Sequence, residues 1–317
     1  MSALLEIDDL SLDFRTRGGT IRALEHVSLS VAAGETVGIV GESGSGKSVL
    51  SFAIMGISDA AARVTAGQIR FEGRELHAAD LAKLRGAQMA MIFQNPRVAL
   101  NPIRAVGKQI EDVLRRHAGV TGTEARSRAV EMLAKVRIPD PERRAAAYPF
   151  EMSGGMCQRV MIALALACSP KLLIADEPTT GLDVTTQAAI MDLIGDLARE
   201  TGMSTILITH DLGLAAQRCD RIAVMHAGHL VEVAATAELF DRPAHPYTRK
   251  LIATTPRPSV GLADLEPIPG SLPDLRGVLP PCRYAQRCER YEAICEAVPL
   301  PRIEVGSAHI VHCARPL

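Results

Sequence analysis

The octapeptide GESGSGKS, residues 41–48, constrains this chain more than any other stretch. It matches the pattern G-x-x-x-x-G-K-[ST], follows the apolar run ETVGIV (35–40) and leads into the helical-looking SVLSFAIM. The glycines let successive backbone N–H groups converge on phosphate oxygens, and the positive end of the following helix adds to that attraction. The sequence therefore predicts a nucleotide-binding loop between a buried strand and a helix.

The residues of this loop have distinct expected roles. We expect Lys47 to reach the β- and γ-phosphates and the Ser48 hydroxyl to ligate Mg²⁺. The backbone supplies the remaining phosphate contacts, at Gly41, Ser43, Gly44, Ser45 and Gly46.

A pair of carboxylates complements the loop. KLLIADE (171–177) is a short apolar run that ends in Asp176 and Glu177. At the carboxyl end of a buried strand, Asp176 suits the Mg²⁺ shell, and Glu177 is placed to orient or deprotonate an attacking water. An isolated pair of this kind is more typical of a solvated turn. In a chain that also has a phosphate loop, the pair instead indicates a catalytic site.

Short strands and helices alternate along most of the chain. Residues 4–31 alternate like strands, and apolar strand-like runs recur at MAMIFQ (89–94), KLLIAD (171–176), STILIT (204–209) and DRIAVMH (220–226). In VTTQAAIMDLIGDLARE, helical spacing puts four apolar residues on one face: Ile190, Leu193, Ile194 and Leu197. This pattern predicts an α/β fold with a mainly parallel sheet covered on both faces. Between Gln94 and Ser153 the strand signals stop, which indicates an inserted helical subdomain.

Composition excludes several classes of function. Lys+Arg 35 against Asp+Glu 36 give a net charge of −1, without the basic excess typical of nucleic-acid binders. No apolar run is long enough to cross a bilayer, and MSALLEIDDL lacks the features of a secretory signal. We expect a soluble chain that reaches a membrane only through partners. Cys157, Cys168 and Cys219 are expected to be small apolar residues in a reducing compartment.

The stretch SGGMCQR (153–159) begins a helix. Alone, its glycine pair would be an ordinary cap. Together with the loop and the carboxylates, it resembles the signature sequence of ABC-type ATPases, usually LSGGQ. This chain has Met152 for the leucine and Met156 for the glutamine, but it retains Ser153, Gly154 and Gly155, which the resemblance implies as phosphate contacts.

The resemblance extends along the whole chain. Gln94 in MIFQNP matches the Q-loop, where it would also ligate Mg²⁺, and Asp183 in TTGLDVTT matches the D-loop. His210 in LITHDL matches the histidine switch, expected at the γ-phosphate, and Phe14 is the expected adenine-stacking aromatic.

The family's fold follows as an expectation. The resemblance implies a P-loop ABC-type nucleotide-binding domain over residues 1–240, with a mainly parallel sheet, an antiparallel β subdomain and a helical subdomain at about 95–155. An irregular cysteine-containing extension would follow over 241–317.

The family also implies a mechanism. Two such domains face each other head to tail, so that ATP on one phosphate loop is covered by Ser153-Gly154-Gly155 of the other. Hydrolysis, with Glu177 and His210 as catalytic residues, would reopen the dimer. The implied partners are a second ABC ATPase subunit, either a copy or a paralogue, and two membrane permeases. They would hold the protein at the cytoplasmic face of the cell membrane.

AHPYT (244–248) and the cysteine-bearing tail resemble the subgroup that serves oligopeptide and dipeptide importers. The implied function is ATP-driven peptide uptake, with an extracytoplasmic peptide-binding protein as a further partner. The alternatives are import of another small solute, such as a nickel chelate or glutathione, or a soluble ABC ATPase acting on nucleic acid or ribosomes. The balanced charge and the single phosphate loop oppose the latter. A module with a degenerate ATPase site is a third alternative, opposed by the intact Lys47 and Glu177.

The tail carries Cys282, Cys288, Cys295 and Cys313, separated by five, six and seventeen residues. Unpaired structural thiols remain possible, and the reducing compartment disfavours disulfides. Zinc remains an alternative, although the usual C-x₂₋₄-C spacing is absent. Four thiolates on a loop-rich segment also suit a [4Fe–4S] cluster, which the importer resemblance implies.

Other features of the tail are less specific. His309 and His312 are either neighbours of the cluster or surface residues. From residue 241 the composition changes, with nine of the nineteen prolines between Pro243 and Pro281, which predicts a linker-like or irregular extension and not more of the core. Because the cysteines are far from the nucleotide motifs in sequence, we assign them no part in hydrolysis.

Overall fold

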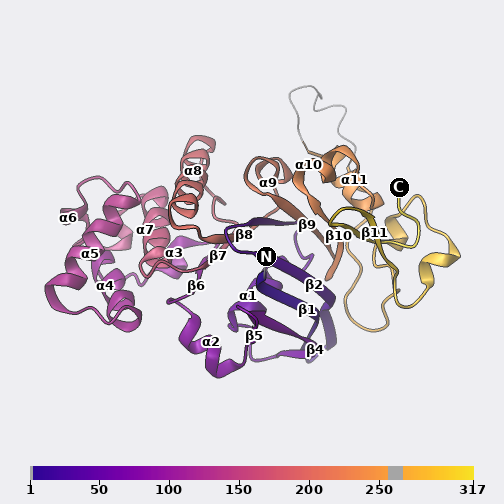
Figure 1. The fold of residues 1–317 in the computed structure, drawn as a ribbon, viewed down its shortest axis with the longest axis horizontal. Helices are drawn as coiled ribbons and strands as arrows, with labels where there is room; N and C mark the ends of the chain where they lie inside the picture. The colour runs from indigo at the N-terminus through magenta and orange to yellow at the C-terminus, as the bar shows by residue number, and fades with distance from the viewer. Residues whose placement is uncertain (1–2, 256–266) are drawn as a thin grey trace. The chain divides into compact units, whose positions relative to one another are not determined.

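A computed structural model describes residues 3–255 and 267–317 (Figure 1). The chain divides into two compact units, one formed by residues 1–76 and 207–317 and the other by residues 77–206. Residues 256–266, which belong to the expected linker, lie outside the described part of the chain. Among the described residues, no helix combines the length and the apolar composition that crossing a bilayer requires.

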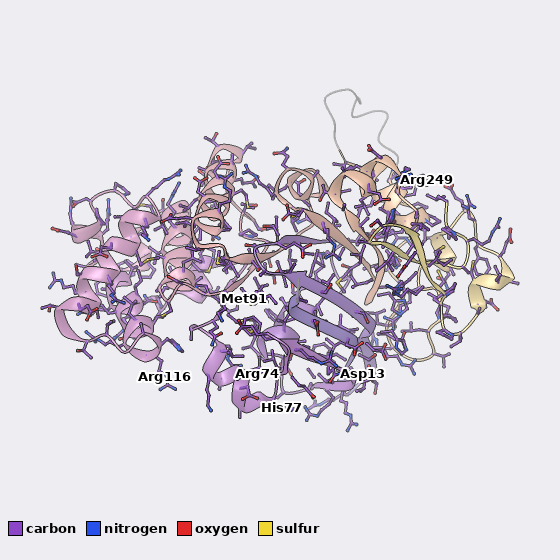
Figure 2. All side chains as sticks on the ribbon, viewed as in Figure 1. Asp13, Arg74, His77, Met91, Arg116 and Arg249 are labelled. Atoms are coloured by element: carbon purple, nitrogen blue, oxygen red, sulfur yellow. The ribbon has the colours of Figure 1, made fainter. Side chains whose placement is uncertain are left out.

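The first unit contains an antiparallel sheet with the strand order β2-β1-β4-β5. Its strands are β1 (Ala3–Thr16), β2 (Gly19–Ala32), β4 (Ala62–Phe71) and β5 (Arg74–Glu75). Asp13, labelled in Figure 2, lies on β1 in register with Arg22 of β2 and Arg63 of β4. Opposite charges on neighbouring strands stabilise this register. The predicted antiparallel β subdomain is confirmed.

The same unit contains a second group of strands in the order β11-β12-β10-β9-β3. They are β3 (Thr36–Val40), β9 (Arg221–His226), β10 (His229–Ala235), β11 (Arg302–Gly306) and β12 (His309–His312). β3 and β9 are parallel, and the other pairs are antiparallel. The helices of this unit are α1 (Lys47–Met55), α9 (Leu212–Arg218), α10 (Thr236–Asp241) and α11 (Pro246–Ala253).

The second unit is mainly helical, as expected between Gln94 and Ser153. Its helices are α2 (Ala78–Leu84), α3 (Pro96–Ala99), α4 (Val106–His117), α5 (Gly122–Lys135), α6 (Pro141–Arg144), the 3₁₀ turn η1 (Pro149–Glu151), α7 (Gly154–Leu166) and α8 (Val184–Thr201). Helices α4, α5, α6 and α7 gather together in Figure 1. The parallel strands β6 (Met89–Ile92) and β7 (Leu172–Asp176) accompany them, and Met91, labelled in Figure 2, is a buried residue of β6. β8 (Ser204–Thr209) carries the chain back into the first unit.

Helix α8 shows how well local patterns predict elements here. Asp183 caps its first turn, and Gly202 in the left-handed conformation ends it. The predicted apolar face is confirmed, because its four residues are buried: Ile190, Leu193, Ile194 and Leu197. A polar N-cap and a terminal glycine are the expected signals for both ends of a helix.

The carboxyl-terminal extension is irregular over much of its length, but it contains more regular structure than the sequence indicated. It includes the 3₁₀ turns η3 (Ala285–Arg287) and η4 (Ala293–Glu296) as well as β11 and β12. β12 pairs with β10 through Val311 opposite Glu232, so it continues the sheet of the first unit. Val311 is fully buried and packs with Ala244 and Cys313. The expectation that the extension adds nothing to the core was therefore wrong, because a four-residue strand is too short to show a pattern.

Candidate functional site

The phosphate loop joins the end of β3 at Val40 to the start of α1 at Lys47. Gly41, Gly44 and Gly46 all have positive φ angles, of 151°, 81° and 106°. A Cβ atom on Gly41 would lie 2.1 Å from the Met225 carbonyl oxygen. The tight curl that directs the loop's N–H groups therefore depends on glycine, as the sequence predicted.

Lys47 is buried at the first position of α1 and turns back over the loop. Its Nζ donates hydrogen bonds to the carbonyl oxygens of Gly41 at 2.7 Å and Glu42 at 2.9 Å. Ser45 is fully buried, whereas Ser48 is exposed in the first turn of the helix. The loop thus brings an ammonium group and a hydroxyl group together at one helix N-terminus.

Phe14, the expected adenine contact, lies half-buried on β1. It is in register with Ile21 of β2 and Ala62 of β4. Ile21 also forms a bridge with Arg276 of the carboxyl-terminal extension, so this edge of the sheet has a neighbour that the sequence did not predict.

In the second unit, the carboxylate pair follows the fully buried strand β7. Asp176 is 4% exposed, and Glu177 has φ 46°, a left-handed conformation that is strained for a residue with a side chain. Glu177 Oε2 accepts hydrogen bonds from Gln94 Nε2 at 3.0 Å and Thr180 Oγ1 at 2.8 Å. The structure therefore brings together Gln94 and Glu177, two residues predicted from separate motifs, because β6 and β7 are parallel neighbours.

The signature stretch begins α7 as predicted. Ser153 caps this helix, its Oγ accepting a hydrogen bond from the Met156 N–H at 3.3 Å. Met152 is buried, so it occupies an apolar position in place of the usual leucine. A Cβ atom on Gly155 would lie 3.0 Å from Thr186 Cγ2, which explains the small residue at this contact with α8.

Asp183 and His210 lie at the starts of other helices. Asp183 Oδ1 accepts from the Thr186 N–H at 3.0 Å, and its Oδ2 accepts from the Thr186 hydroxyl at 2.7 Å. These hydrogen bonds hold the pKa of Asp183 below its usual value. His210 is exposed at the end of β8, immediately before the α9 cap Asp211. His210 and the phosphate loop belong to the first unit, and Asp183 belongs to the second.

Comparison with known sequences accounts for this set of motifs. The family described as ABC transporter matches residues 24–180, and the region described as oligopeptide/dipeptide transporter, C-terminal region, matches residues 231–295. A putative peptide import ATP-binding protein of Brucella abortus is 47% identical over 98% of this chain and 94% of its own length. The chain belongs to the ABC transporter family.

Further relatives of this ABC ATPase agree. The dipeptide transport ATP-binding protein DppD of Bacillus subtilis is 44% identical over 99% of this chain and 95% of its own length. The oligopeptide transport ATP-binding protein OppD of Salmonella typhimurium is 44% identical over 100% of this chain and 95% of its own. An ATP-binding cassette solved as a dimer bound to ADP and Pi has a TM-score of 0.65 and 30% identity, covering 73% of this chain and 98% of that one. The predicted α/β ABC fold is confirmed.

The ABC ATPase brings its four tail cysteines to one place. Cys282, Cys288, Cys295 and Cys313 all line one small cavity. All seven cysteines of the chain are free. Burial, and then the neighbouring thiols, raise the pKa of Cys282 to about 11. Within residues 3–255 and 267–317, however, no three His, Cys, Asp or Glu side chains are arranged to hold a metal ion. The four thiols therefore share a cavity but do not form a ready metal site in this arrangement.

The two histidines of the tail differ from each other. His309 is 2% exposed, and its Nε2 lies 2.7 Å from Glu232 Oε1 while its Nδ1 lies 3.3 Å from Glu238 Oε1. The interpretation of His309 as a surface residue is therefore wrong, because it joins β12 to β10 and α10. His312 is half-buried, and burial lowers its pKa to about 4.

Sequence reasoning missed a contact between the tail and the phosphate loop. Arg287, next to Cys288, pairs with Glu42 inside GESGSGKS, and the Glu42 N–H donates to the hydroxyl of Tyr247. Tyr247 belongs to AHPYT, which served only as a marker of the importer subgroup. The one signal in the sequence was the carboxylate of Glu42 at a variable position of the loop. Distance along the chain was therefore a poor reason to separate the tail from the nucleotide motifs.

Proposed function

We propose that this ABC ATPase powers the uptake of di- or oligopeptides through a membrane importer. One observation carries the proposal: relatives named for peptide, dipeptide and oligopeptide transport align over the whole chain, including its carboxyl-terminal region. The nucleotide-binding core is common to many transporters, so the extension is the part that favours peptides over other solutes.

At the catalytic site, the amides of Gly41, Ser43, Gly44, Ser45 and Gly46 hold the phosphates of ATP. Lys47 neutralises the charge of the β- and γ-phosphates, and Phe14 stacks on adenine. The buried position of Lys47 supports this role, because water screens its charge less there.

Glu177 orients or deprotonates the attacking water. The hydrogen bonds that Gln94 and Thr180 donate to its Oε2 support this role, because they fix the position of the carboxylate. Gln94 donates through its amide nitrogen, so its carbonyl oxygen remains for Mg²⁺, with Ser48 and Asp176 as the other protein ligands. One glutamine thereby connects the metal with the general base.

Two nucleotide-binding domains assemble head to tail. Ser153, Gly154 and Gly155 of one domain cover the ATP on the other, and the N-terminal end of α7 attracts its phosphates. Asp183 adjoins this contact at the start of α8, and the exposed His210 reaches the γ-phosphate. ATP binding favours the closed dimer, and hydrolysis removes that preference and lets it reopen.

The partners follow from this role. A second ABC ATPase subunit, a copy or a paralogue, completes the dimer. Two permeases hold it at the cytoplasmic face of the membrane, and an extracytoplasmic peptide-binding protein delivers the solute. The net charge of −1 gives no support to a nucleic-acid partner.

Cys282, Cys288, Cys295 and Cys313 hold a [4Fe–4S] cluster, with zinc as the alternative. The shared cavity of the four thiols supports this, and so does a donor set made only of sulfur. Their side chains would have to turn toward one centre and lose their protons on loading. The bound group would then cross-link the extension.

The cofactor proposal is tested by anaerobic purification. We expect brown protein with broad visible absorption and stoichiometric iron and sulfide, lost in Cys288→Ser. Cys168→Ser, outside the cavity, is the control and should keep the colour. Colourless protein with stoichiometric zinc would establish the alternative, and metal-free protein would reject both.

The transport proposal is tested in proteoliposomes that contain the permeases and the binding protein encoded beside this chain. We expect ATP-dependent uptake of a labelled di- or oligopeptide, absent with the Glu177→Gln subunit. Uptake of a nickel chelate or glutathione without peptide would replace the substrate. Salt-sensitive DNA binding without any membrane partner would reject transport altogether.

A further inference from the structure

Arg287 connects the carboxyl-terminal extension to the phosphate loop. Its guanidinium forms a bidentate ion pair with Glu42, with NH1 2.7 Å from Oε2 and NH2 2.9 Å from Oε1. Its Nε donates to the Pro269 carbonyl oxygen at 2.7 Å, and NH1 also lies 3.1 Å from Nε2 of His226. The Arg287 side chain is only 3% exposed. A charge that is both buried and bonded at every nitrogen fixes the position of its partner closely.

Glu42 passes this constraint to the loop. Its carboxylate binds Arg287, and its N–H donates to the Tyr247 hydroxyl at 3.1 Å. Its carbonyl oxygen accepts the hydrogen bond from Lys47 Nζ. The residue is therefore held at its side chain and at both backbone groups, and its carbonyl group contacts the lysine expected at the phosphates.

Arg287 is also joined to the cysteine cavity through its neighbours Cys288 and Tyr284. Arg287 directly precedes Cys288, and its own N–H donates to the Tyr284 carbonyl oxygen at 2.9 Å. Tyr284 lines the cysteine cavity, and its ring lies 5.3 Å from both Tyr247 and His226. The same small cluster of rings thus borders the cysteine cavity and supports the contacts to Glu42.

We propose that Arg287 is a positioning residue for the phosphate loop, acting through Glu42 to hold the Lys47 ammonium in the place where it meets phosphate. The carboxyl-terminal extension thereby sets the affinity of this ATPase for MgATP. The proposal rests on the proposed role of Lys47 and the loop in nucleotide binding. It is independent of the transported solute and of the group that the cysteines hold.

A second buried arginine of the extension provides a matched control. Arg283 is 1% exposed, and its NH2 pairs with Glu25 Oε2 at 2.6 Å, while its NH1 donates to the Arg22 carbonyl oxygen at 3.1 Å. Both of these partners lie on β2. Its NH1 also donates to the Ala227 carbonyl oxygen. Arg283 therefore fastens the same extension to the same unit, but within the described residues these hydrogen bonds and this ion pair reach no residue between Gly41 and Ser48.

The experiment compares Arg287→Gln with Arg283→Gln in the full chain. We expect Arg287→Gln to raise the Kd and the KM for MgATP roughly tenfold, since a charge-assisted pair is lost, with a smaller change in kcat. Amide hydrogen exchange over residues 41–47 should become faster. Arg283→Gln should lower the melting temperature and leave the Kd for MgATP within about twofold. Equal effects of the two variants on Kd would reduce Arg287 to a general structural contact and overturn the proposal.

Glu42→Gln tests the same ion pair by changing its other partner, the residue in the loop. It also keeps the proposal testable if Arg287→Gln does not fold. We expect the same rise in KM, with no further rise in the double variant, because both changes break one interaction. An unchanged KM in Glu42→Gln, or additive effects, would contradict the proposal. Lys47→Ala distinguishes a failure of the proposed nucleotide-binding role of the loop from a failure of the proposed role of Arg287. If it leaves MgATP affinity unchanged, the role of the loop fails; if it weakens binding while Arg287→Gln does not, only the present inference fails.

Discussion

The phosphate loop and Glu177 each follow a buried strand, but different kinds of residues hold them in position. Glu42 of the loop is bound by Arg287 and Tyr247, which lie 245 and 205 residues away in sequence. Glu177 is bound by Thr180, three residues away, and by Gln94, which follows the neighbouring strand β6 by two residues. Each site is held by residues of its own unit, but the partners of Glu42 come from the far end of the chain, whereas those of Glu177 include a residue three positions away.

The difference has a physical basis. A glycine-rich loop has few side chains with which to pack, and its many accessible conformations make ordering costly. External contacts therefore contribute much of what holds it. A residue that follows a fully buried strand is already fixed at one end, so that hydrogen bonds from nearby residues can orient its side chain.

The largest effect is expected at the locally built site. Glu177→Gln should lower kcat by about 10² to 10⁴-fold while MgATP still binds, because the amide cannot accept the proton of water. Rapid-quench ATPase assays and gel filtration with ATP measure turnover and the closed dimer. Glu200→Gln, on the exposed surface of α8, is the control. Turnover near the wild-type rate would remove Glu177 as the general base.

At the loop, the corresponding change is Lys47→Ala. We expect the Kd for MgATP to rise about 10- to 100-fold, since the charge-assisted contacts with phosphate are lost. Titration calorimetry measures the affinity, and the surface variant Lys135→Ala should bind as the wild type does. Comparison with Glu177→Gln distinguishes a loss of ATP binding at the loop from a loss of the hydrolysis step at Glu177.

The rings of His226, His245, Tyr247 and Tyr284, which pack together beside the loop, make the first unit sensitive to acid. Burial, together with the nearby charges of Arg287, His229 and Arg283, lowers the pKa of His226 to about 3, and burial lowers that of His245 to about 3. Because these folded-state values lie below the unfolded value of 6.5, the stability from the neutral rings is complete above pH 6.5 and falls as the pH drops toward 3. Between pH 7 and pH 5 the loss is on the order of 2 kcal/mol for each ring.

Urea unfolding at several pH values measures this loss. His226→Gln should make the dependence between pH 7 and pH 5 shallower by one such contribution, whatever its own stability, and leave the contributions of His245 and His312. Glu25, whose pKa is lowered to about 2 mainly by its hydrogen bond with His229, contributes only below pH 4.5 and does not interfere. An equally steep dependence in His226→Gln would show that this ring is not the sensitive group.

The smallest expected effect on kcat comes from a residue that contacts Glu177. Thr180→Val removes one of the two hydrogen bonds on Oε2 and should lower kcat about fivefold at unchanged KM. Thr180→Ser keeps the hydroxyl and should retain the wild-type rate. If Thr180→Val is silent, the Thr180 hydroxyl is not needed to orient the carboxylate.

Local patterns predicted most of the core. The phosphate loop, the cap of α8 at Asp183 and the start of α7 at Ser153 depend on the backbone preferences of a few adjacent residues. Gln94 was predicted only through the ABC resemblance, and the pairing of β6 with β7 then brought it to Glu177. Such features are visible in sequence because each needs particular residue types within one or two turns of chain.

The tail was less predictable. β12 is too short to show a period, and His309 is polar and therefore resembled a surface residue, although it is buried between two carboxylates. Arg287 likewise gave no signal, since a single arginine in an irregular segment is usually exposed.

By itself, the sequence determined that this chain is an ABC ATPase with a phosphate loop, a carboxylate pair and four cysteines in its tail. Only the tertiary structure decided that those cysteines share one cavity and that Arg287, beside them, holds Glu42 in the loop. The reason is that a motif consists of residues close together in sequence, whereas a buried ion pair forms only where packing brings together two distant segments.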